Sequence, residues 1–281
     1  MANGILHIVA TPIGNLNDIT LRALEVLRQV DLIAAEDTRH SRKLLDAYQI
    51  GTRLIAVHDH NEADRAGYLC SLLGEGKNIA LISDAGTPLI SDPGYRLVRE
   101  VRDAGFQVVT IPGACAAIAA LAVAGLPTDR FLFVGFLSAK DNARRLELER
   151  LQGQTATLVL YESPKRIVEL LRAVAEVMGG DRPVVLAKEL TKAFETVRGG
   201  TAGELVAWLE EDEHRQRGEF VVLIHGYQES GDGTLIDAAV LRSIALAHAH
   251  MPLKKACALV SELTGLAKNQ LYEAALKQIK A

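Results

Sequence analysis

The sequence predicts an α/β protein with two α/β domains and a small helical tail. Through the first 113 residues, apolar runs of four or five residues alternate with amphipathic helical stretches. The alternation resumes after residue 114 and gives way to helical patterns alone after residue 234. Strands that alternate with helices are typical of a parallel sheet with helical crossovers, so we expect such a sheet in the first segment.

The first segment, residues 1–113, has the most regular alternation. Strands are expected at residues 6–10, 32–35, 54–57, 79–82 and 108–111. Helices are expected at residues 21–30, 41–48, 63–73 and 95–104. Polar or turn-forming residues follow at least four of these strands, and parallel strands end at the same edge of a sheet. Because open α/β sheets bind ligands at that edge, we expect a site there.

The second segment, residues 114–228, begins with a run of small residues that predicts a helix at 114–125. Further strands are expected at residues 131–136, 156–161, 183–190 and 219–225, and helices at residues 144–151, 167–178 and 202–211. This pattern predicts a second α/β layer with some antiparallel pairing. A polar, glycine-rich linker at 226–233 then leads to a tail, residues 234–281, with helices at residues 235–250, 253–264 and 268–280.

Composition limits the class of protein. The chain has 281 residues, of which 49% are hydrophobic and 23% charged, as in ordinary globular proteins. No apolar run reaches about 18 residues, so no membrane span is expected. The chain starts without a basic, signal-like segment, and its three cysteines lie far apart, which together predict a protein of the reducing cytoplasm. Aromatic residues make up only 5%, which argues against an RNA module that works by base stacking.

Positive charge is distributed unevenly. The net charge is −4, yet residues 234–281 hold six Lys or Arg against three Asp or Glu. A second basic cluster spans residues 39–43. Side chains of this kind contact phosphates in nucleic-acid complexes, although solvated helix surfaces carry them equally often. The candidate phosphate contacts are Arg39, Arg42, Lys254 and Lys255.

The stretch LISDAGTPLISDPG, residues 81–94, is the most informative part of the chain. It follows an apolar strand and precedes a helical pattern that begins at Tyr95. Glycine lets the backbone approach a ligand closely, and proline fixes the shape of a loop without an N–H that needs a partner. The composition predicts one wall of a ligand site, with a simple turn as the alternative.

Several common motifs are absent. The sequence has neither a G-x-G-x-x-G after its first strand nor a phosphate-binding G-x-x-x-x-G-K-[ST]. It also has no G-x-S-x-G nucleophile elbow and no paired C-x-x-C. The one group that resembles metal ligands is HDHNE, residues 58–62, and we expect it to serve as polar loop residues rather than as a metal site. The commonest nucleotide ligands are thereby excluded, and no bound metal is expected.

Eight short motifs occur in order along the chain: TPIGNL (11–16), AAEDTR (34–39), HDHNE (58–62), SDAGTPLISDPG (83–94), IPGACA (111–116), YES (161–163), AKELTK (187–192) and GE (218–219). Taken together they resemble the tetrapyrrole-methylase-like family of S-adenosylmethionine-dependent methyltransferases. The segments PLKKA (252–256) and KNQLY (268–272) resemble a helix-turn-helix-like tail found in that family. Ala114 departs from the pattern, since the family commonly has Pro or Gly there.

The resemblance implies a homodimer of two-domain chains, each with the methyl donor bound in a cleft between its two α/β domains. It also implies that the acceptor is the ribose 2′-hydroxyl of a decoding-region cytidine in small-subunit ribosomal RNA. By this analogy, three loops and one tyrosine would contact the donor. These residues are Pro12, Ser83, Asp84, Gly86, Thr87, Leu89, Ile90, Ser91, Pro112, Ala114, Cys115, Ala116 and Tyr161.

Methyl transfer to a ribose hydroxyl requires alignment and a base or a polarising cation, because the hydroxyl is a poor nucleophile. Asp92, Lys188 and Glu189 are the favoured candidates, ahead of Glu36, Asp37, Arg39 and Lys192. Each has a structural alternative. Asp92 and Asp37 are suited to capping the helices that follow them, and the Lys188–Glu189 pair is suited to a solvated strand end.

Two other functions compete with RNA methylation. The same fold supports carbon methylation of a precorrin-type tetrapyrrole, and fold alone does not choose between the two substrates. A protein that binds the donor and RNA without catalysis, as an assembly factor, is the third possibility. The basic tail and the 39–43 cluster favour a large polyanionic substrate.

Overall fold

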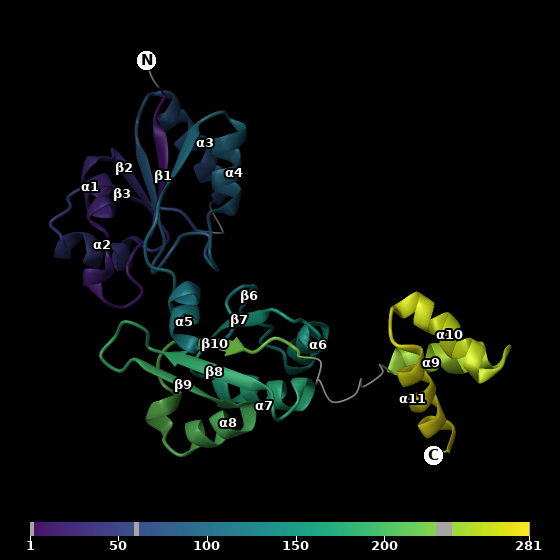
Figure 1. Ribbon diagram of the computed structural model, residues 1–281. Coiled ribbons are helices and arrows are strands. Elements are labelled where there is room, and N and C mark those ends of the chain that lie inside the picture. Colours follow the sequence, from purple (N-terminus) through teal and green to yellow (C-terminus); the bar gives the residue numbers. More distant parts are fainter. Residues whose placement is uncertain (1–2, 59–61, 229–237, 281) are drawn as a thin grey trace. The chain divides into compact units, whose positions relative to one another are not determined.

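The computed structural model describes residues 3–58, 62–228 and 238–280 (Figure 1). Contacts within the chain divide it into two compact units, residues 1–226 and 227–281. The first unit contains two five-stranded sheets. The expected domain limits at residues 113, 228 and 234 stay predictions, and most of the expected linker lies outside the described residues.

The first sheet is entirely parallel, as the alternation predicts, with strand order β3-β2-β4-β1-β5. Its strands are β1 (Ile5–Val9), β2 (Leu32–Ala35), β3 (Leu54–Ala56), β4 (Ile79–Ile82) and β5 (Gln107–Ile111). Four helices connect them: α1 (Leu21–Gln29), α2 (Thr38–Ala47), α3 (Glu62–Gly74) and α4 (Tyr95–Asp103). Parallel pairing places the carboxyl ends of all five strands at one edge.

Both faces of the first sheet are covered by helices (Figure 1). Ile33 of β2 and Ile82 of β4 pack with Leu27 of α1, whereas Leu32 and Leu81 of the same strands pack on the other side with α3 and α4. Successive strand residues point to opposite faces, so a strand covered on both faces becomes a continuous apolar run. This explains the uninterrupted LIAA and IALI sequences of β2 and β4.

The second sheet is mixed, with strand order β6-β7-β10-β8-β9. Its strands are β6 (Phe131–Gly135), β7 (Thr157–Glu162), β8 (Pro183–Lys188), β9 (Thr196–Thr201) and β10 (Phe220–Ile224). The β6–β7 pair is parallel, and the other neighbours are antiparallel. The expected antiparallel pairing in the second layer is confirmed.

Strand β9 is absent from the sequence-based expectation, which was wrong to leave residues 196–201 without structure. Its sequence is TVRGGT, and it is an edge strand that pairs with β8 alone. Val197, Arg198 and Gly199 are exposed, and the other three residues of the strand are partly exposed. A strand with no buried face carries no alternation of apolar residues, so the usual sequence signal is missing.

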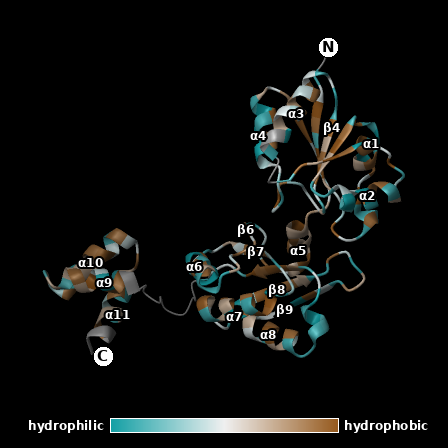
Figure 2. Ribbon diagram, turned by 180° about the vertical axis from the view of Figure 1, so that it is seen from behind, coloured by the Kyte–Doolittle hydropathy of each residue, from teal (hydrophilic) through white to brown (hydrophobic). Residues whose placement is uncertain are grey.

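The two faces of the second sheet are covered by different helices. Helix α5 (Ala116–Ala124) packs on one face, and Ala120 contacts the cluster formed by Val159, Val185 and Val221. Helices α6 (Asp141–Leu151), α7 (Ile167–Met178) and α8 (Ala202–Glu210) pack on the other face. Figure 2 shows α5 as hydrophobic throughout and α6 as largely hydrophilic. Helix α5 buries Ala117, Ala120 and Leu121, whereas its apolar Ile118 and Val123 stay about half exposed.

The second unit is a three-helix cluster of α9 (Ala238–His248), α10 (Leu253–Thr264) and α11 (Lys268–Lys280). Ile244, Cys257, Val260 and Leu271 form its small core. Gly265 ends α10 in a left-handed conformation with φ of 75°, which fits the helix stop expected there. Among the described residues, no helix of either unit is long and apolar enough to span a membrane.

Candidate functional site

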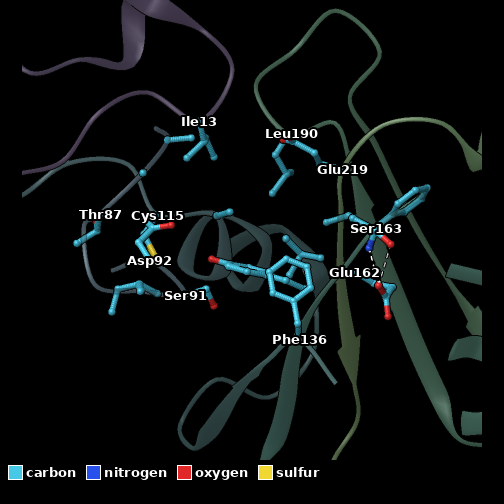
Figure 3. A pocket seen from close by; sticks show the side chains of 18 of the residues that line it. Ile13, Thr87, Ser91, Asp92, Cys115, Phe136, Glu162, Ser163, Leu190 and Glu219 are labelled. Carbon is cyan, nitrogen blue, oxygen red and sulfur yellow. Dashed lines mark hydrogen bonds between the residues drawn. The ribbon is translucent and has the colours of Figure 1, made fainter. Parts of the chain in front are cut away.

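A cavity of about 380 Å³ lies between the carboxyl-end loops of the first sheet and the second sheet (Figure 3). Its volume is within the range of cavities that bind small organic ligands. The first-sheet side and the start of α5 contribute Ile13, Ala85, Gly86, Thr87, Ile90, Ser91, Asp92, Cys115 and Ala116. The second-sheet side contributes Phe136, Tyr161, Glu162, Ser163, Pro164, Ala187, Leu190, Glu219, Phe220 and Val221. We call this space the first cavity.

Backbone contacts fix the loops that form the first-sheet side. Thr11 N donates to Gly86 O at 2.8 Å, and Gly86 N donates to Thr11 O at 3.1 Å, which ties the loop after β1 to the loop after β4. Thr87 Oγ1 donates to Ala114 O at 3.0 Å and so connects the β4 loop to the segment before α5. Gly86 has φ of 82°, and a Cβ there would lie 3.3 Å from Ile13. The positive φ favours glycine here, and the space beside Ile13 is tight for any side chain.

The 81–94 loop contains two residues in an unfavourable backbone conformation. Leu89 has φ of 74° and Ser91 has φ of 65°, a region that residues other than glycine rarely adopt. Gly135 at the end of β6 also has positive φ, and a Cβ there would lie 3.3 Å from Ser91 Oγ. Such backbone strain concentrates at ligand sites, where surrounding contacts maintain it. The loop is thus more than a connection between strand and helix.

Asp92 is half-buried on the wall of the first cavity. Burial raises the pKa of its carboxyl group, a hydrogen bond with Ser83 lowers it, and the negative charge of Asp84 raises it, for a net increase. A carboxylate with raised pKa is a stronger base than an exposed one. Among the three predicted catalytic residues, Asp92 alone lines the cavity.

Tyr161 connects the second sheet to the start of α5. Its hydroxyl oxygen accepts a hydrogen bond from Ala117 N at 3.0 Å. Its ring makes edge contacts with Phe133 and Phe136, with centroid distances of 5.0 and 5.7 Å. Burial raises the pKa of Tyr161 well above its ordinary value, so the hydroxyl stays protonated. Tyr161 therefore lines the first cavity and also caps the N-terminus of α5.

The structure places the predicted donor contacts in three groups. Gly86, Thr87, Ile90, Ser91, Cys115, Ala116 and Tyr161 line the first cavity. Pro12, Ser83 and Asp84 line a neighbouring cavity, described below. Leu89, Pro112 and Ala114 are not among the lining residues of either cavity in the described part of the chain. Leu89 packs in the core between the first sheet and α4, and Ala114 supports Thr87 through its carbonyl.

Lys188 ends β8 and Glu189 follows it, and neither residue lines either cavity. Lys188 is buried, and its Nζ donates to His214 O at 3.1 Å. Glu189 Oε1 accepts from Lys192 Nζ and from Glu219 N, each at 2.9 Å. Burial raises the pKa of Glu189, but the hydrogen bonds from Lys192 and Glu219 outweigh it and lower the pKa overall. A carboxylate with a lowered pKa is a poor base, so these contacts give Glu189 a positioning role.

Asp37 and Asp84 act on the first turn of α2. Asp37 Oδ1 accepts from Arg39 N at 2.7 Å and from His40 N at 3.4 Å, which makes it the N-cap. Asp84 Oδ1 accepts from Asp37 N at 3.1 Å. The capping alternative for Asp37 is therefore confirmed, and Asp84 holds α2 in place beside the 81–94 loop.

The four predicted phosphate contacts occur in both units. Arg39 is almost fully exposed, with 93% of its side chain accessible, at the start of α2. Arg42 is half-buried in the same helix. Lys254 and Lys255 are exposed in the first turn of α10. The described residues include no cluster of three or more His, Cys, Asp or Glu that is arranged to bind a metal, and residues 59–61 of the HDHNE segment lie outside them.

Sequence reasoning missed most of the second-sheet wall. Phe136, Leu190 and Glu219 line the first cavity but are absent from the predicted contacts. Phe136 and Leu190 come just after β6 and β8, and Glu219 comes just before β10. Their position beside predicted strand ends was therefore the sequence signal that could have identified them. Glu162 ends β7 and forms a buried ion pair with Arg166 at 2.7 Å, and Ser163 N donates to it at 2.6 Å (Figure 3). This pair holds the chain as it leaves the sheet beside the cavity.

Comparison with known proteins identifies the fold and the family. The family model described as "Tetrapyrrole (Corrin/Porphyrin) Methylases" matches residues 5–206, which include strands β1 to β9. The chain belongs to the tetrapyrrole methylase family. A second model, "RsmI C-terminal HTH domain", matches residues 234–280, so this methylase also carries the helix-turn-helix tail that its sequence resembles.

The relatives of this methylase with high identity share one name. The proteins called "Ribosomal RNA small subunit methyltransferase I" from Escherichia coli O157:H7 and Pseudomonas aeruginosa are 54% and 52% identical to it. Each alignment covers 99% of this chain and at least 96% of the relative. These relatives confirm the resemblance on which the sequence-based expectations depend.

Solved structures confirm the methylase fold. A uroporphyrin-III-C-methyltransferase from Thermus thermophilus matches with a TM-score of 0.56 and 23% identity. The cobalt precorrin-4 methyltransferase CbiF matches with a TM-score of 0.59 and 18% identity. Both cover 79% of this chain and 94% of their own. At these identities the two structures show the shared fold and leave the substrate open.

Proposed function

We propose that this chain is an S-adenosylmethionine-dependent methyltransferase that methylates the ribose 2′-hydroxyl of a decoding-region cytidine in small-subunit ribosomal RNA. The observation that carries the proposal is near full-length identity above 50% to proteins named as ribosomal RNA small subunit methyltransferases. The shape and chemistry of the first cavity support it. A homodimer in the cytoplasm that acts on the small ribosomal subunit is part of the same proposal.

The residues of the first cavity suit a donor with a flat aromatic ring, hydroxyl groups and a cationic sulfur, folded up in the cleft. Ile13, Phe136 and Leu190 offer apolar surface for a ring system. Thr87 and Ser91 bring hydroxyl groups to the same wall, and Asp92 brings a carboxylate. Bound in this cavity, S-adenosylmethionine supplies an electrophilic methyl group.

The reaction needs alignment more than a nucleophilic side chain. The C–S bond of the sulfonium breaks as the C–O bond to the ribose forms, and the hydroxyl proton leaves to a base. Asp92 is placed on the cavity wall and has a raised pKa, so we assign it as the base that takes this proton. The strained 81–94 loop holds Asp92 in position, and the enclosing second sheet excludes water from the sulfonium.

The proposal is tested with labelled methyl donor. Purified protein is incubated with undermethylated small ribosomal subunits, with naked small-subunit RNA, and with a precorrin substrate, and the label is located by nuclease mapping and mass spectrometry. We expect label on the 2′-oxygen of one cytidine. Label on a base would refute the 2′-oxygen assignment, label on the precorrin would favour tetrapyrrole chemistry, and donor binding without transfer would favour an assembly factor.

A further inference from the structure

A second cavity of about 300 Å³ lies beside the first one. The two share Ile13, Ala85 and Glu219 in their linings, so they adjoin. Figure 3 shows Ile13, Leu190 and Glu219 together at one end of the first cavity. Methyl transfer requires donor and acceptor atoms to approach within about 3–3.5 Å in the correct orientation. That requirement favours an acceptor site that adjoins the donor cavity.

The second cavity is lined by polar residues of α2 and by two members of an ion-pair triad, Lys192 and Glu219. His40 and Lys43 of α2 line it, and both are exposed. Lys192 lines it from the loop after β8. Of the two carboxylates on its wall, Asp84 already accepts from Asp37 N. The other, Glu219, is paired with Lys192.

Lys192 is held in place by two carboxylates. Its Nζ lies 2.9 Å from Glu189 Oε1 and 3.0 Å from Glu219 Oε2. An ammonium group has three hydrogens to donate, and these two contacts use two of them, so the third can be donated to a ligand. Burial lowers the pKa of Lys192, but hydrogen bonds with the two carboxylates outweigh it and raise the pKa. Lys192 therefore acts as a fixed cation and hydrogen-bond donor, not as a base.

The backbone around Lys192 is shaped to place it there. Glu189 has φ of 52° and Thr191 has φ of 65°, both in the left-handed region. A Cβ at Gly14 would lie 2.6 Å from Lys192 Cγ, so the loop after β1 must have glycine to admit the lysine stem. A Cβ at Gly218 would likewise lie 2.5 Å from Glu189 Cγ. The strained residues Glu189 and Thr191 thus belong to the same loop as Lys192, and Gly14 and Gly218 pack closely against the triad side chains.

We propose that the second cavity receives the acceptor nucleotide, with the Glu189–Lys192–Glu219 triad positioning its ribose and with His40 and Lys43 holding its phosphate. The triad offers a cationic donor beside carboxylate acceptors, which suits ribose hydroxyl groups. Of the two α2 residues, Lys43 offers a positive charge and His40 a ring nitrogen for hydrogen bonding, which suit a phosphodiester. This inference rests on the proposed function, and it adds the location and the contacts of the acceptor.

The test separates acceptor binding from donor binding and from catalysis. Lys192→Met removes the ammonium and keeps an apolar stem, whereas Lys192→Arg retains a cation. Lys43→Gln removes one phosphate contact. Lys77→Gln is the matched control, because Lys77 is a half-exposed lysine paired with Asp31 at 3.5 Å near the opposite, amino end of β4. Each full-length variant is measured for donor Kd, for Kd of undermethylated small subunits, and for kcat and KM.

Lys192→Met is expected to raise the Kd and KM for subunits roughly tenfold or more, because it loses a charge-assisted hydrogen bond. Lys192→Arg should recover part of that loss. Lys43→Gln should raise the same constants and reduce the salt dependence of binding by about one charge. Donor Kd should stay within about twofold of the wild-type value in every variant, and Lys77→Gln should match the wild type throughout.

Two results would overturn the inference. Unchanged subunit binding in both Lys192→Met and Lys43→Gln would show that the second cavity does not hold the acceptor. A selective rise in donor Kd would assign the cavity to the donor instead. If wild-type protein binds subunits but transfers no methyl group, the proposed function fails, and the subunit Kd values still decide the location of the acceptor.

Discussion

Removing the hydroxyl group of Tyr161 should destabilise the first unit by about 2 kcal/mol, although the change is a single atom. The hydroxyl oxygen accepts from Ala117 N at 3.0 Å in the first turn of α5. Helix N-termini have backbone N–H groups without intrahelical acceptors, and Cys115 at the N-cap position makes no side-chain capping bond. Tyr161 thus caps α5 from a strand of the second sheet.

The expected magnitude follows from the burial of the partner. Ala117 is only 3% exposed, so water cannot replace the lost acceptor in Tyr161→Phe. Leaving a buried donor unsatisfied costs about 1–3 kcal/mol. For a unit of this size, about 2 kcal/mol lowers Tm by roughly 4–8 °C. The ring contacts with Phe133 and Phe136 do not involve the hydroxyl group and remain in the variant.

Urea unfolding followed by tryptophan fluorescence measures this change. The chain has one tryptophan, Trp208, and it lies in α8, so fluorescence reports on the first unit. The matched control is Tyr48→Phe, because the Tyr48 hydroxyl donates to Leu16 O at 2.6 Å in an exposed setting where water can substitute. That control should stay within about 0.5 kcal/mol of the wild type. Equal stability of the two variants would refute the capping role.

Three further outcomes are expected. Asp92→Asn should lower kcat at least about 100-fold. It should also remove the acidic limb of the pH–rate profile, which in the wild type should have an apparent pKa above the ordinary aspartate value. Because folding raises the pKa of Asp92, its ionised carboxylate destabilises the fold at pH values above the unfolded-state pKa, and this cost disappears as the pH falls. The Tm of Asp92→Asn at pH 7 should therefore be no lower than that of the wild type. Thr201→Ala should cost about 1 kcal/mol in urea unfolding, because Thr201 caps α8 in a capping box with Glu204, and a cost near zero would contradict this. Exchanging Lys254 and Lys255 for Gln should weaken subunit binding and flatten its salt dependence with donor Kd unchanged, and an unchanged salt slope would remove both from the RNA surface.

The interior of both sheets was predictable because buried strands and helices leave a periodic apolar pattern. Strands β2 and β4 read as short apolar runs, and both are buried along their whole length. The edge strand β9 left no such pattern, because its side chains face solvent and its pairing uses backbone atoms that every residue has. The strand forms because β8 pairs with β10 on one side only and leaves its other edge for β9.

The first-sheet side of the site was also predictable, since glycine, proline and aspartate after a strand mark a ligand loop. The roles of individual polar residues were not. Asp37, Asp92 and Glu189 are all carboxylates in loops that follow strands, yet Asp37 caps a helix, Asp92 lines a cavity and has a raised pKa, and Glu189 is paired with a lysine. For Asp92 and Glu189, the difference comes from neighbours outside the local sequence pattern, which sequence inspection does not reveal.

The sequence by itself determined the α/β class and the loop at residues 81–94, because burial periodicity and turn chemistry are local properties. The family followed from the resemblance of its ordered motifs to those of known methylases. Only the tertiary structure decided that this loop, with Leu89 and Ser91 held in left-handed conformations, faces the ends of β7 and β10 across one cavity. It also decided that Lys192, Glu189 and Glu219 form one triad against Gly14. Gly14 packs against the Lys192 side chain and Glu219 forms an ion pair with the same lysine. Packing and charge interactions depend on distance in space rather than on position along the chain.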